Sequence, residues 1–265
     1  MIEQAVFRGT DPVARSGGYS DEYVETTQSM IDALGLTSGD REALFVYRWA
    51  NDVVAVAQSR GTLIRVLTVP GSLYRLVHDP FRLTREFTPE FTVRGELLAL
   101  PWIQGRPAPR NLTDVQKVLR EGDAPTLLGA AQALVDGGRI VFQRPQPDQI
   151  LFEQIWMLLP DSVRGELSIA TFASNNALGF DLLVAPAADR DSFPRYLTER
   201  HAGDYPEGRY ELALQMAVES ANEGQMRELF ARRSGSQAMR LAWTLLLAAI
   251  GLGLAMRFIP WEKLR

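Results

Sequence analysis

Residues 43–69, ALFVYRWANDVVAVAQSRGTLIRVLTV, decide the fold of the first half of this chain. Three runs in this stretch, 43–49, 52–58 and 63–69, are rich in the β-branched and aromatic residues that favour strands. The connections between the runs are short, so consecutive strands are expected to pair antiparallel. The middle run is apolar throughout residues 53–57, which predicts a central strand that is covered on both faces.

The residues before these strands predict one more strand and one helix. Residues 2–7 are strand-like, and the Gly- and Pro-containing segment that ends at residues 16–18 is expected to be a loop. Ser20 is a suitable N-cap for a helix that has Tyr23 as its third residue and ends at Gly35.

The second half of the chain carries more helical patterns than strand patterns. It follows a connector at 79–110, which is broken by prolines and is expected to wrap over the first sheet. We therefore expect an α+β fold, with an antiparallel, sheet-rich subdomain at 1–110 and a helix-rich subdomain at 111–233 packed on it. The expected helices lie at 113–120, 126–135, 149–159 and 208–233, the last interrupted at Gly224, and the expected strands lie at 139–143, 167–173 and 180–184.

Residues 241–256, LAWTLLLAAIGLGLAM, form the only long uncharged run of the chain and predict a membrane anchor. At roughly 1.5 Å per residue this run covers about 24 Å, less than the roughly 30 Å hydrocarbon core. An arginine after the run can turn its guanidinium toward the headgroups, and two flanking tryptophans suit the membrane interfaces. The alternative is a buried C-terminal core helix. We expect a linker and a transmembrane helix at 234–265, marked by Arg240, Leu241, Trp243, Met256, Arg257 and Trp261.

The charge of the chain argues against a nucleic-acid partner. The tail from Arg232 onward carries a net charge of +5, so a whole-chain charge of −4 leaves −9 on the body. An acidic body offers no basic surface that would neutralise several phosphates. The N-terminus has no basic segment followed by an apolar one, so no signal peptide is expected. We expect a single-pass protein of the inner (cytoplasmic) membrane that contacts membrane lipid and whose body faces the cytoplasm.

Few residues are suited to catalysis or to metal binding. The chain has no cysteine and only two histidines, so disulfides are excluded and His-based metal clusters are nearly excluded. No Walker loop, dinucleotide fingerprint or nucleophile elbow is present, so no cofactor is expected. An imidazole that follows a helix commonly caps it, and an Asn- and Gly-rich loop commonly only joins two strands. The candidate polar site residues are His78, Asp79, Ser174, Asn175, Asn176 and His201.

Several short segments together resemble a known family. They are 2–7 (IEQAVF), 68–70 (TVP), 78–81 (HDPF), 95–97 (GEL), 134–138 (LVDGG) and 172–181 (FASNNALGFD). Over most of residues 2–233 the chain resembles the N-terminal domain of bacterial GTPase-associated adaptor proteins. The resemblance implies a non-catalytic adaptor that works beside a GTPase in a bacterial signalling or defence system. It also implies a variable C-terminal part that sets output or location, and it transfers no catalytic residue to this chain.

Three functions remain open at this point. The first is recruitment of a protein partner, a GTPase by the resemblance, to the membrane. The second is a membrane-anchored, hydrolase-like enzyme with a polar cleft between the two halves. A pocket that brings His78, Asp79 and Asn175 together would favour the enzyme, and their scatter over exposed loops would favour the adaptor. The third function, self-assembly into a structure, would require a large apolar patch on the body.

Overall fold

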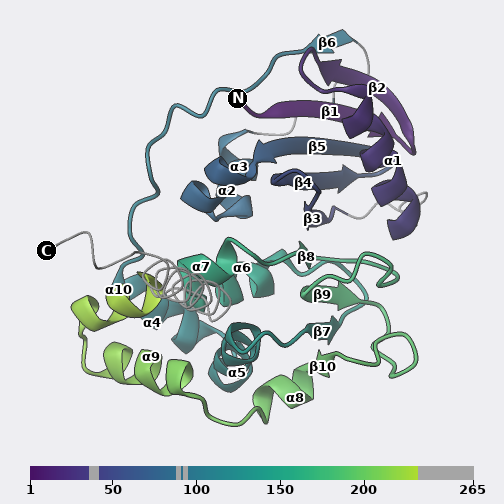
Figure 1. The fold of residues 1–265 in the computed structure, drawn as a ribbon. Coiled ribbons are helices and arrows are strands. Elements are labelled where there is room, and N and C mark those ends of the chain that lie inside the picture. Colours follow the sequence, from purple (N-terminus) through teal and green to yellow (C-terminus); the bar gives the residue numbers. More distant parts are fainter. Residues whose placement is uncertain (36–41, 88–90, 92–94, 232–265) are drawn as a thin grey trace, which may run out of the picture.

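The computed structural model describes residues 1–35, 42–87, 91 and 95–231. Its strands form one large mixed sheet, and together with the helices they give a mixed α/β fold. The strands are β1 (Glu3–Arg8), β2 (Asp11–Ser16), β3 (Leu44–Arg48), β4 (Val53–Arg60), β5 (Leu63–Pro70), β6 (Gly95–Leu97), β7 (Ile140–Gln143), β8 (Ile169–Ala170), β9 (Leu182–Ala185) and β10 (Leu197–Thr198). Their order across the sheet is β10-β7-β9-β8-β3-β4-β5-β1-β2-β6, which runs from the bottom to the top of Figure 1.

The first five strands along the chain pair antiparallel, as their short connections predicted. Strand β4 lies between β3 and β5, and its residues 54–57 are buried. The predicted central strand is therefore confirmed. The parallel pairings among the described strands are those of β10, β7, β9 and β8 in the second half, and that of β6 with β2.

The prediction of a loop before Gly17 is wrong, because most of this segment forms strand β2. Gly9, with φ of +58°, allows a tight turn after β1, and β2 returns along β1 as a hairpin. The inward-facing residues of β2 are small, since Ala14 and Ser16 are the buried ones. Small residues give a weak strand pattern, which explains why the sequence did not reveal this strand.

Most of the helices lie where the sequence predicted them. Their bounds are α1 (Asp21–Leu34), α2 (Gly71–Val77), α3 (Pro80–Glu86), α4 (Leu112–Glu121), α5 (Ala124–Val135), α6 (Gln149–Leu158), α7 (Asp161–Arg164), α8 (Glu199–Gly203), α9 (Arg209–Glu219) and α10 (Glu223–Ala231). The predicted caps of α1 are confirmed: Ser20 accepts a hydrogen bond from the N–H of Tyr23 (3.3 Å), and Gly35 ends the helix with φ of +62°.

The segment 79–110 is more regular than its prolines suggested. Pro80 begins α3, because the first turn of a helix does not need the N–H that proline lacks. Asp79 caps this helix by accepting a hydrogen bond from the N–H of Arg82 (2.9 Å). Further along, residues 95–97 form β6 and extend the sheet at its edge.

The helix expected over 208–233 is two helices, α9 and α10, and the break precedes Gly224. The chain turns at residues 220–222, where Ala221 has φ of +52°. Asn222 then accepts a hydrogen bond from the N–H of Gln225 (3.0 Å) and so starts the second helix. Gly224 lies within the first turn of α10.

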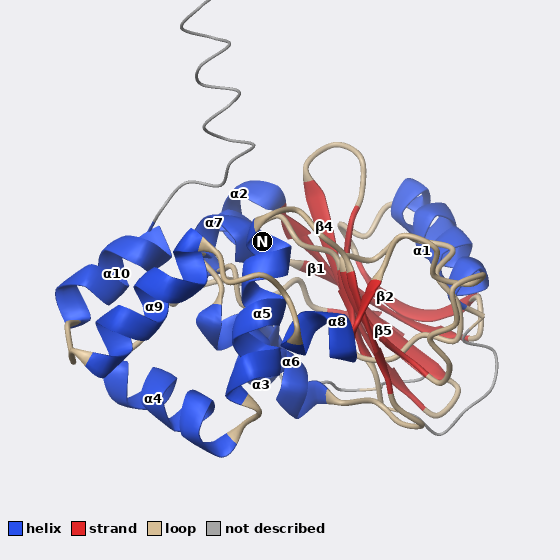
Figure 2. Ribbon diagram, turned by 90° about the horizontal axis from the view of Figure 1, so that it is seen from below, coloured by secondary structure: helices blue, strands red, loops and turns tan. Residues whose placement is uncertain are grey.

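The two halves of the chain share the sheet through the pairing of β3 with β8. The N–H of Leu44 donates to the Thr171 hydroxyl oxygen (2.8 Å), and the N–H of Thr171 donates to the carbonyl oxygen of Leu44 (2.9 Å). Both residues are buried. Helix α1 lies on one side of the strands, and the group that contains α2, α5 and α6 lies on the other (Figure 2).

Among the helices of the described part of the chain, none is both long enough and apolar enough to cross a bilayer. The predicted linker and anchor, residues 234–265, lie outside the described residues.

Replacing Thr171 by Val should lower the free energy of unfolding by about 1–3 kcal/mol, because the buried N–H of Leu44 loses its acceptor while the volume stays the same. Urea unfolding of the full chain in mild detergent measures the change. Thr26→Val is the matched control, since that hydroxyl donates to a carbonyl at the exposed surface of α1 (2.8 Å) and its loss should change stability by less than about 0.5 kcal/mol. Equal effects of the two substitutions would contradict the proposed role of Thr171.

Candidate functional site

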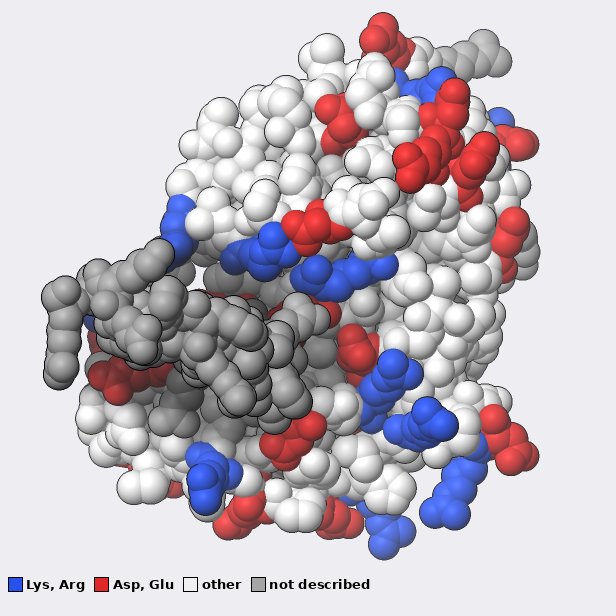
Figure 3. Space-filling model, viewed as in Figure 1, with Lys and Arg blue, Asp and Glu red and all other residues white. Residues whose placement is uncertain are grey.

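A cavity of about 340 Å³ lies where the two halves of the chain meet. Its walls come from the start of α3 and residues 106–110 on one side, and from α6, α7 and the end of α10 on the other. Figure 3 shows Lys and Arg side chains gathered along the boundary between the halves. We call the cavity the arginine pocket, after the arginines that line it: Arg85, Arg106, Arg110, Arg164 and Arg227.

The turn between α2 and α3 brings two of the predicted residues into this pocket. His78 is the C-cap of helix α2, with φ of +37°, and donates its backbone N–H to the carbonyl oxygen of Tyr74. The cap is made by the backbone and not, as the sequence had suggested, by the imidazole. Asp79 follows as the N-cap of α3. The indole N–H of Trp156 in α6 donates to the carbonyl oxygen of His78 (3.0 Å) and fixes the turn against the second half.

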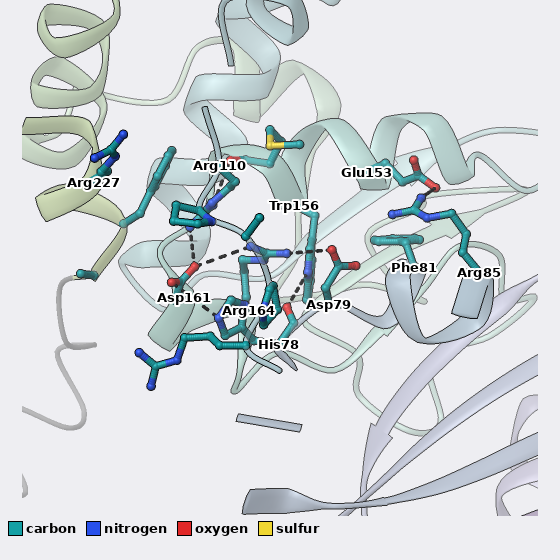
Figure 4. A pocket seen from close by; sticks show the side chains of 17 residues that line it. His78, Asp79, Phe81, Arg85, Arg110, Glu153, Trp156, Asp161, Arg164 and Arg227 are labelled. Atoms are coloured by element: carbon teal, nitrogen blue, oxygen red, sulfur yellow. Dashed lines mark hydrogen bonds and ion pairs between the residues drawn. The ribbon is translucent and has the colours of Figure 1, made fainter. Parts of the chain in front are cut away.

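Asp161, the first residue of α7, is the centre of the charges in the pocket. Its carboxylate lies 2.5 Å from Arg110, 3.6 Å from Arg164 and 3.5 Å from the Nε2 atom of His78. Arg164 also contacts Asp79, at 3.3 Å. Figure 4 shows these side chains converging from different segments of the chain. Two carboxylates thus compensate two guanidiniums across the junction of the halves.

Arg110 and Arg164 are unusual because they are buried, with 10% and 7% of their side chains exposed. Burial lowers the pKa of both guanidiniums, and the charge of Arg164 lowers the pKa of Arg110 further. Both remain protonated at neutral pH, as arginines in proteins do. Arg110 is held further by donating to the carbonyl oxygens of Met157 (2.9 Å) and Leu159 (2.5 Å), and it lies 3.6 Å from the ring centre of Phe230.

His78 is the neutral member of the cluster. Burial, and after it the positive charge of Arg164, lowers the pKa of its imidazole to about 4, although Asp161 opposes the shift. The ring is therefore uncharged at pH 7. Its Nδ1 atom is buried and has no hydrogen-bond partner among the residues that the structure describes, and the same is true of the Nε atom of Arg164.

The polar loop at 174–176 lies away from the arginine pocket, and its side chains support local structure. The Ser174 hydroxyl donates to a backbone carbonyl at the end of α1 (3.5 Å). Asn175 accepts from the N–H of Ala177 (2.9 Å), and Asn176 accepts from the hydroxyl of Tyr196 (2.9 Å). None of the three loop residues lines the pocket.

His201 lies at a third place, on α8, where it is exposed. Its Nδ1 atom accepts from the backbone N–H of Thr198 (3.2 Å) and completes a capping box at the start of the helix. The structure thus brings His78 and Asp79 together and leaves the other four candidates elsewhere. The predicted anchor residues from Arg240 to Trp261 lie outside the described residues.

Sequence reasoning missed Arg110, Asp161 and Arg164, the residues that dominate the pocket. Arg110 ends a connector rich in prolines, and the other two lie in a helix of four residues, so no periodic pattern marks them. A usable signal was the spacing of Asp161 and Arg164, which places opposite charges three residues apart on one helix face. No feature of the sequence indicated that these two arginines would be buried.

The side chains of the pocket suit the binding of an anion better than catalysis. A guanidinium offers a fork of N–H donors that matches carboxylate and phosphate oxygens. A general base works best with a pKa near the working pH, which the shifted pKa of His78 does not meet. The described residues that line the pocket include no Ser, Thr, Tyr or Lys that a neighbouring base would activate.

Comparisons of the chain with models of protein families, with curated proteins and with solved structures found no match. In the described residues, no group of three or more His, Asp or Glu side chains is placed to hold a metal ion.

The burial of His78 should make stability depend on pH. In the unfolded chain this imidazole takes up a proton near pH 6.5, whereas in the folded chain it does so only near pH 4. The free energy of unfolding therefore falls as the pH drops from 6.5 to 4. The contribution lost at pH 5 is about 2 kcal/mol. Urea unfolding at pH 7.5 and pH 5 should therefore show a smaller loss for His78→Gln than for the wild type.

If His78→Gln lost as much stability on acidification as the wild type, the imidazole would not be buried in its neutral form.

Proposed function

We propose that this protein is a membrane-tethered, non-catalytic adaptor that recruits a protein partner in a bacterial signalling or defence system. A GTPase is the partner that the family resemblance suggests. In this proposal residues 1–110 and 111–233 form the body on the cytoplasmic side, and residues 234–265 hold it at the inner membrane.

The observation that carries the proposal is the separation of the polar candidates. His78 and Asp79 line the arginine pocket, whereas residues 174–176 and His201 support a loop and a helix start elsewhere. An enzyme needs its nucleophile, its base and its stabilising donors within about 3 Å of one reacting group. Scatter of this kind supports recruitment over catalysis.

The position of the last described helix is compatible with tethering. Helix α10 ends at Ala231, and residues 232–240 separate it from the uncharged run. Nine residues reach at most about 32 Å when fully extended, so an anchored body would stay close to the bilayer. A tether confines even a weakly bound partner to this layer and raises its effective concentration without new contacts.

A membrane-anchored, hydrolase-like enzyme is the second candidate, and one observation favours it. His78 and Asp79 do lie in a pocket between the halves, as that hypothesis required. Asn175, its third member, lies outside the pocket, and the low pKa of His78 weakens it as a base. The adaptor is therefore the better-supported function.

The tether is tested by fractionation in a bacterial host. The full chain should stay with membranes after a carbonate wash, and a chain that ends at Arg233 should be released. Two charges within the run, Leu247→Arg with Ile250→Arg, should also release it, because each costs about 3 kcal/mol at the centre of a span. Leu98→Arg with Ile103→Arg is the matched control, since both side chains are exposed on the body (82% and 86%), and it should remain in membranes.

Recruitment is tested with the same variants. GTP hydrolysis that co-sediments with membranes washed in neutral buffer, without carbonate, should rise with the full chain and the body control, and should stay at background with the Leu247→Arg, Ile250→Arg chain. Release of the full chain by carbonate would overturn the tether. Ester or phosphoester hydrolysis by the purified protein that His78→Gln abolishes would overturn the non-catalytic assignment.

A further inference from the structure

The charges that line the arginine pocket are not balanced. The lining has three carboxylates, Asp79, Glu153 and Asp161, and five arginines, and His78 is neutral at pH 7. Because Glu223, outside the lining, compensates Arg227, an excess of one positive charge remains. Such an excess in a cavity that is partly closed to water attracts an anion.

The excess belongs to the mouth of the pocket rather than to its floor. On the floor the two buried arginines share two carboxylates, and at one side Arg85 contacts Glu153 at 3.3 Å. Arg227 contacts Glu223, an acid outside the pocket lining, at 2.7 Å. Arg106 is exposed and makes no ion pair with any residue that the structure describes. Among the described residues nothing occupies its guanidinium, which is therefore available to a ligand.

The floor also offers hydrogen-bonding atoms that lack partners. The Nε atom of Arg164 and the Nδ1 atom of His78 are buried and make no hydrogen bond within the described part of the chain. Buried polar atoms in folded proteins are almost always satisfied by protein, water or ligand. Both residues line the cavity. A ligand oxygen would accept from the Nε–H of Arg164, whereas the Nδ1 atom of the neutral His78, whose Nε2 faces Asp161, is an acceptor and would take a hydrogen bond from a hydroxyl group or a water molecule.

The remaining wall is apolar and aromatic. Phe81 and Trp156 meet edge to face with ring centres 6.1 Å apart, and Met157 and Phe230 continue this wall. A cavity of about 340 Å³ lies within the range of pockets that hold small organic ligands, roughly 300–1,000 Å³. An inorganic ion would fill only part of it and leave the aromatic wall uncovered.

We propose that the arginine pocket binds an organic phosphate monoester. The phosphate lies among Arg106, Arg110 and Arg164, and the organic body packs against Trp156 and Phe81. A phosphate monoester presents three acceptor oxygens, one for each of these guanidiniums, and carries close to two negative charges at neutral pH, whereas a carboxylate has two oxygens and one charge. The proposed ligand site is independent of the proposed recruitment function. Ligand binding and membrane tethering are measured separately, and either one can fail alone.

Isothermal titration calorimetry of the full chain in mild detergent tests the site with phenyl phosphate as the probe. Phenyl phosphate should bind about tenfold more tightly than inorganic phosphate, because its ring covers the aromatic wall. Phenylacetate, which has one negative charge, and phenol, which has none, should both bind more weakly than phenyl phosphate. Equal affinity for phenyl phosphate and inorganic phosphate, equal affinity for phenyl phosphate and phenylacetate, or no heat with any probe would overturn the proposal.

Two variants separate the pocket from general charge effects. Arg106→Gln should weaken phenyl phosphate binding about fivefold, the loss expected for one partly exposed charge contact. Arg190→Gln is the matched control, since Arg190 is also exposed and lies on the loop after β9, and it should bind as the wild type does. Ala108→Trp, at an exposed position that lines the cavity, should fill the pocket and remove binding without changing charge. Wild-type affinity in both pocket variants would overturn the assignment.

The phosphate could belong to a soluble metabolite or to a lipid headgroup, and nanodiscs distinguish these sources. The full chain is inserted into discs of phosphatidylcholine alone or of phosphatidylcholine with phosphatidic acid, and phenyl phosphate is titrated into both. Weaker apparent binding of phenyl phosphate in the discs that contain phosphatidic acid would identify the headgroup as the ligand. The Arg190→Gln chain should show the same weakening. Equal binding in the two discs would identify a soluble phosphate ester.

Discussion

Two guanidiniums can be buried side by side only if negative charge lies close to both. In this fold Asp161 contacts Arg110 and Arg164 at once, and Asp79 supports the second arginine from the other half of the chain. The turn after α2, the end of the proline-rich connector and the four-residue helix α7 must therefore meet at one point. Removing either carboxylate would leave a buried charge uncompensated, so the position of the two halves is tied to this cluster as well as to the shared sheet.

The sequence revealed those parts of the fold that depend on neighbours along the chain. The hairpin strands β3, β4 and β5 and the caps at Ser20 and Gly35 are local, and they are confirmed. Strand β2 was missed because its buried residues are small, and β8 is only two residues long in the structure. At the site, His78 and Asp79 stood out by residue type, but the burial of the arginines arises from contacts between distant segments. No local pattern carries that information.

The arginine pocket is lined in part by α10, the last helix of the described part of the chain. Phe230 lies under the guanidinium of Arg110, and one residue later the described part of the chain ends, shortly before the predicted linker. A ligand that draws Arg110 toward the cavity would change the packing of the last helix of the body. Occupancy of the pocket and the packing of α10 would thus be connected through one aromatic contact.

The pairing of β3 with β8 has a consequence for biosynthesis. Leu44 and Thr171 are 127 residues apart, so the outer edge of β3 is made long before its partner. At 5–20 residues per second this interval lasts roughly 6–25 s on the ribosome. During that time an apolar strand edge, with Phe45 and Val46 at its centre, stays open to other chains. We therefore expect nascent chains of this protein to depend on holding chaperones until the second half emerges.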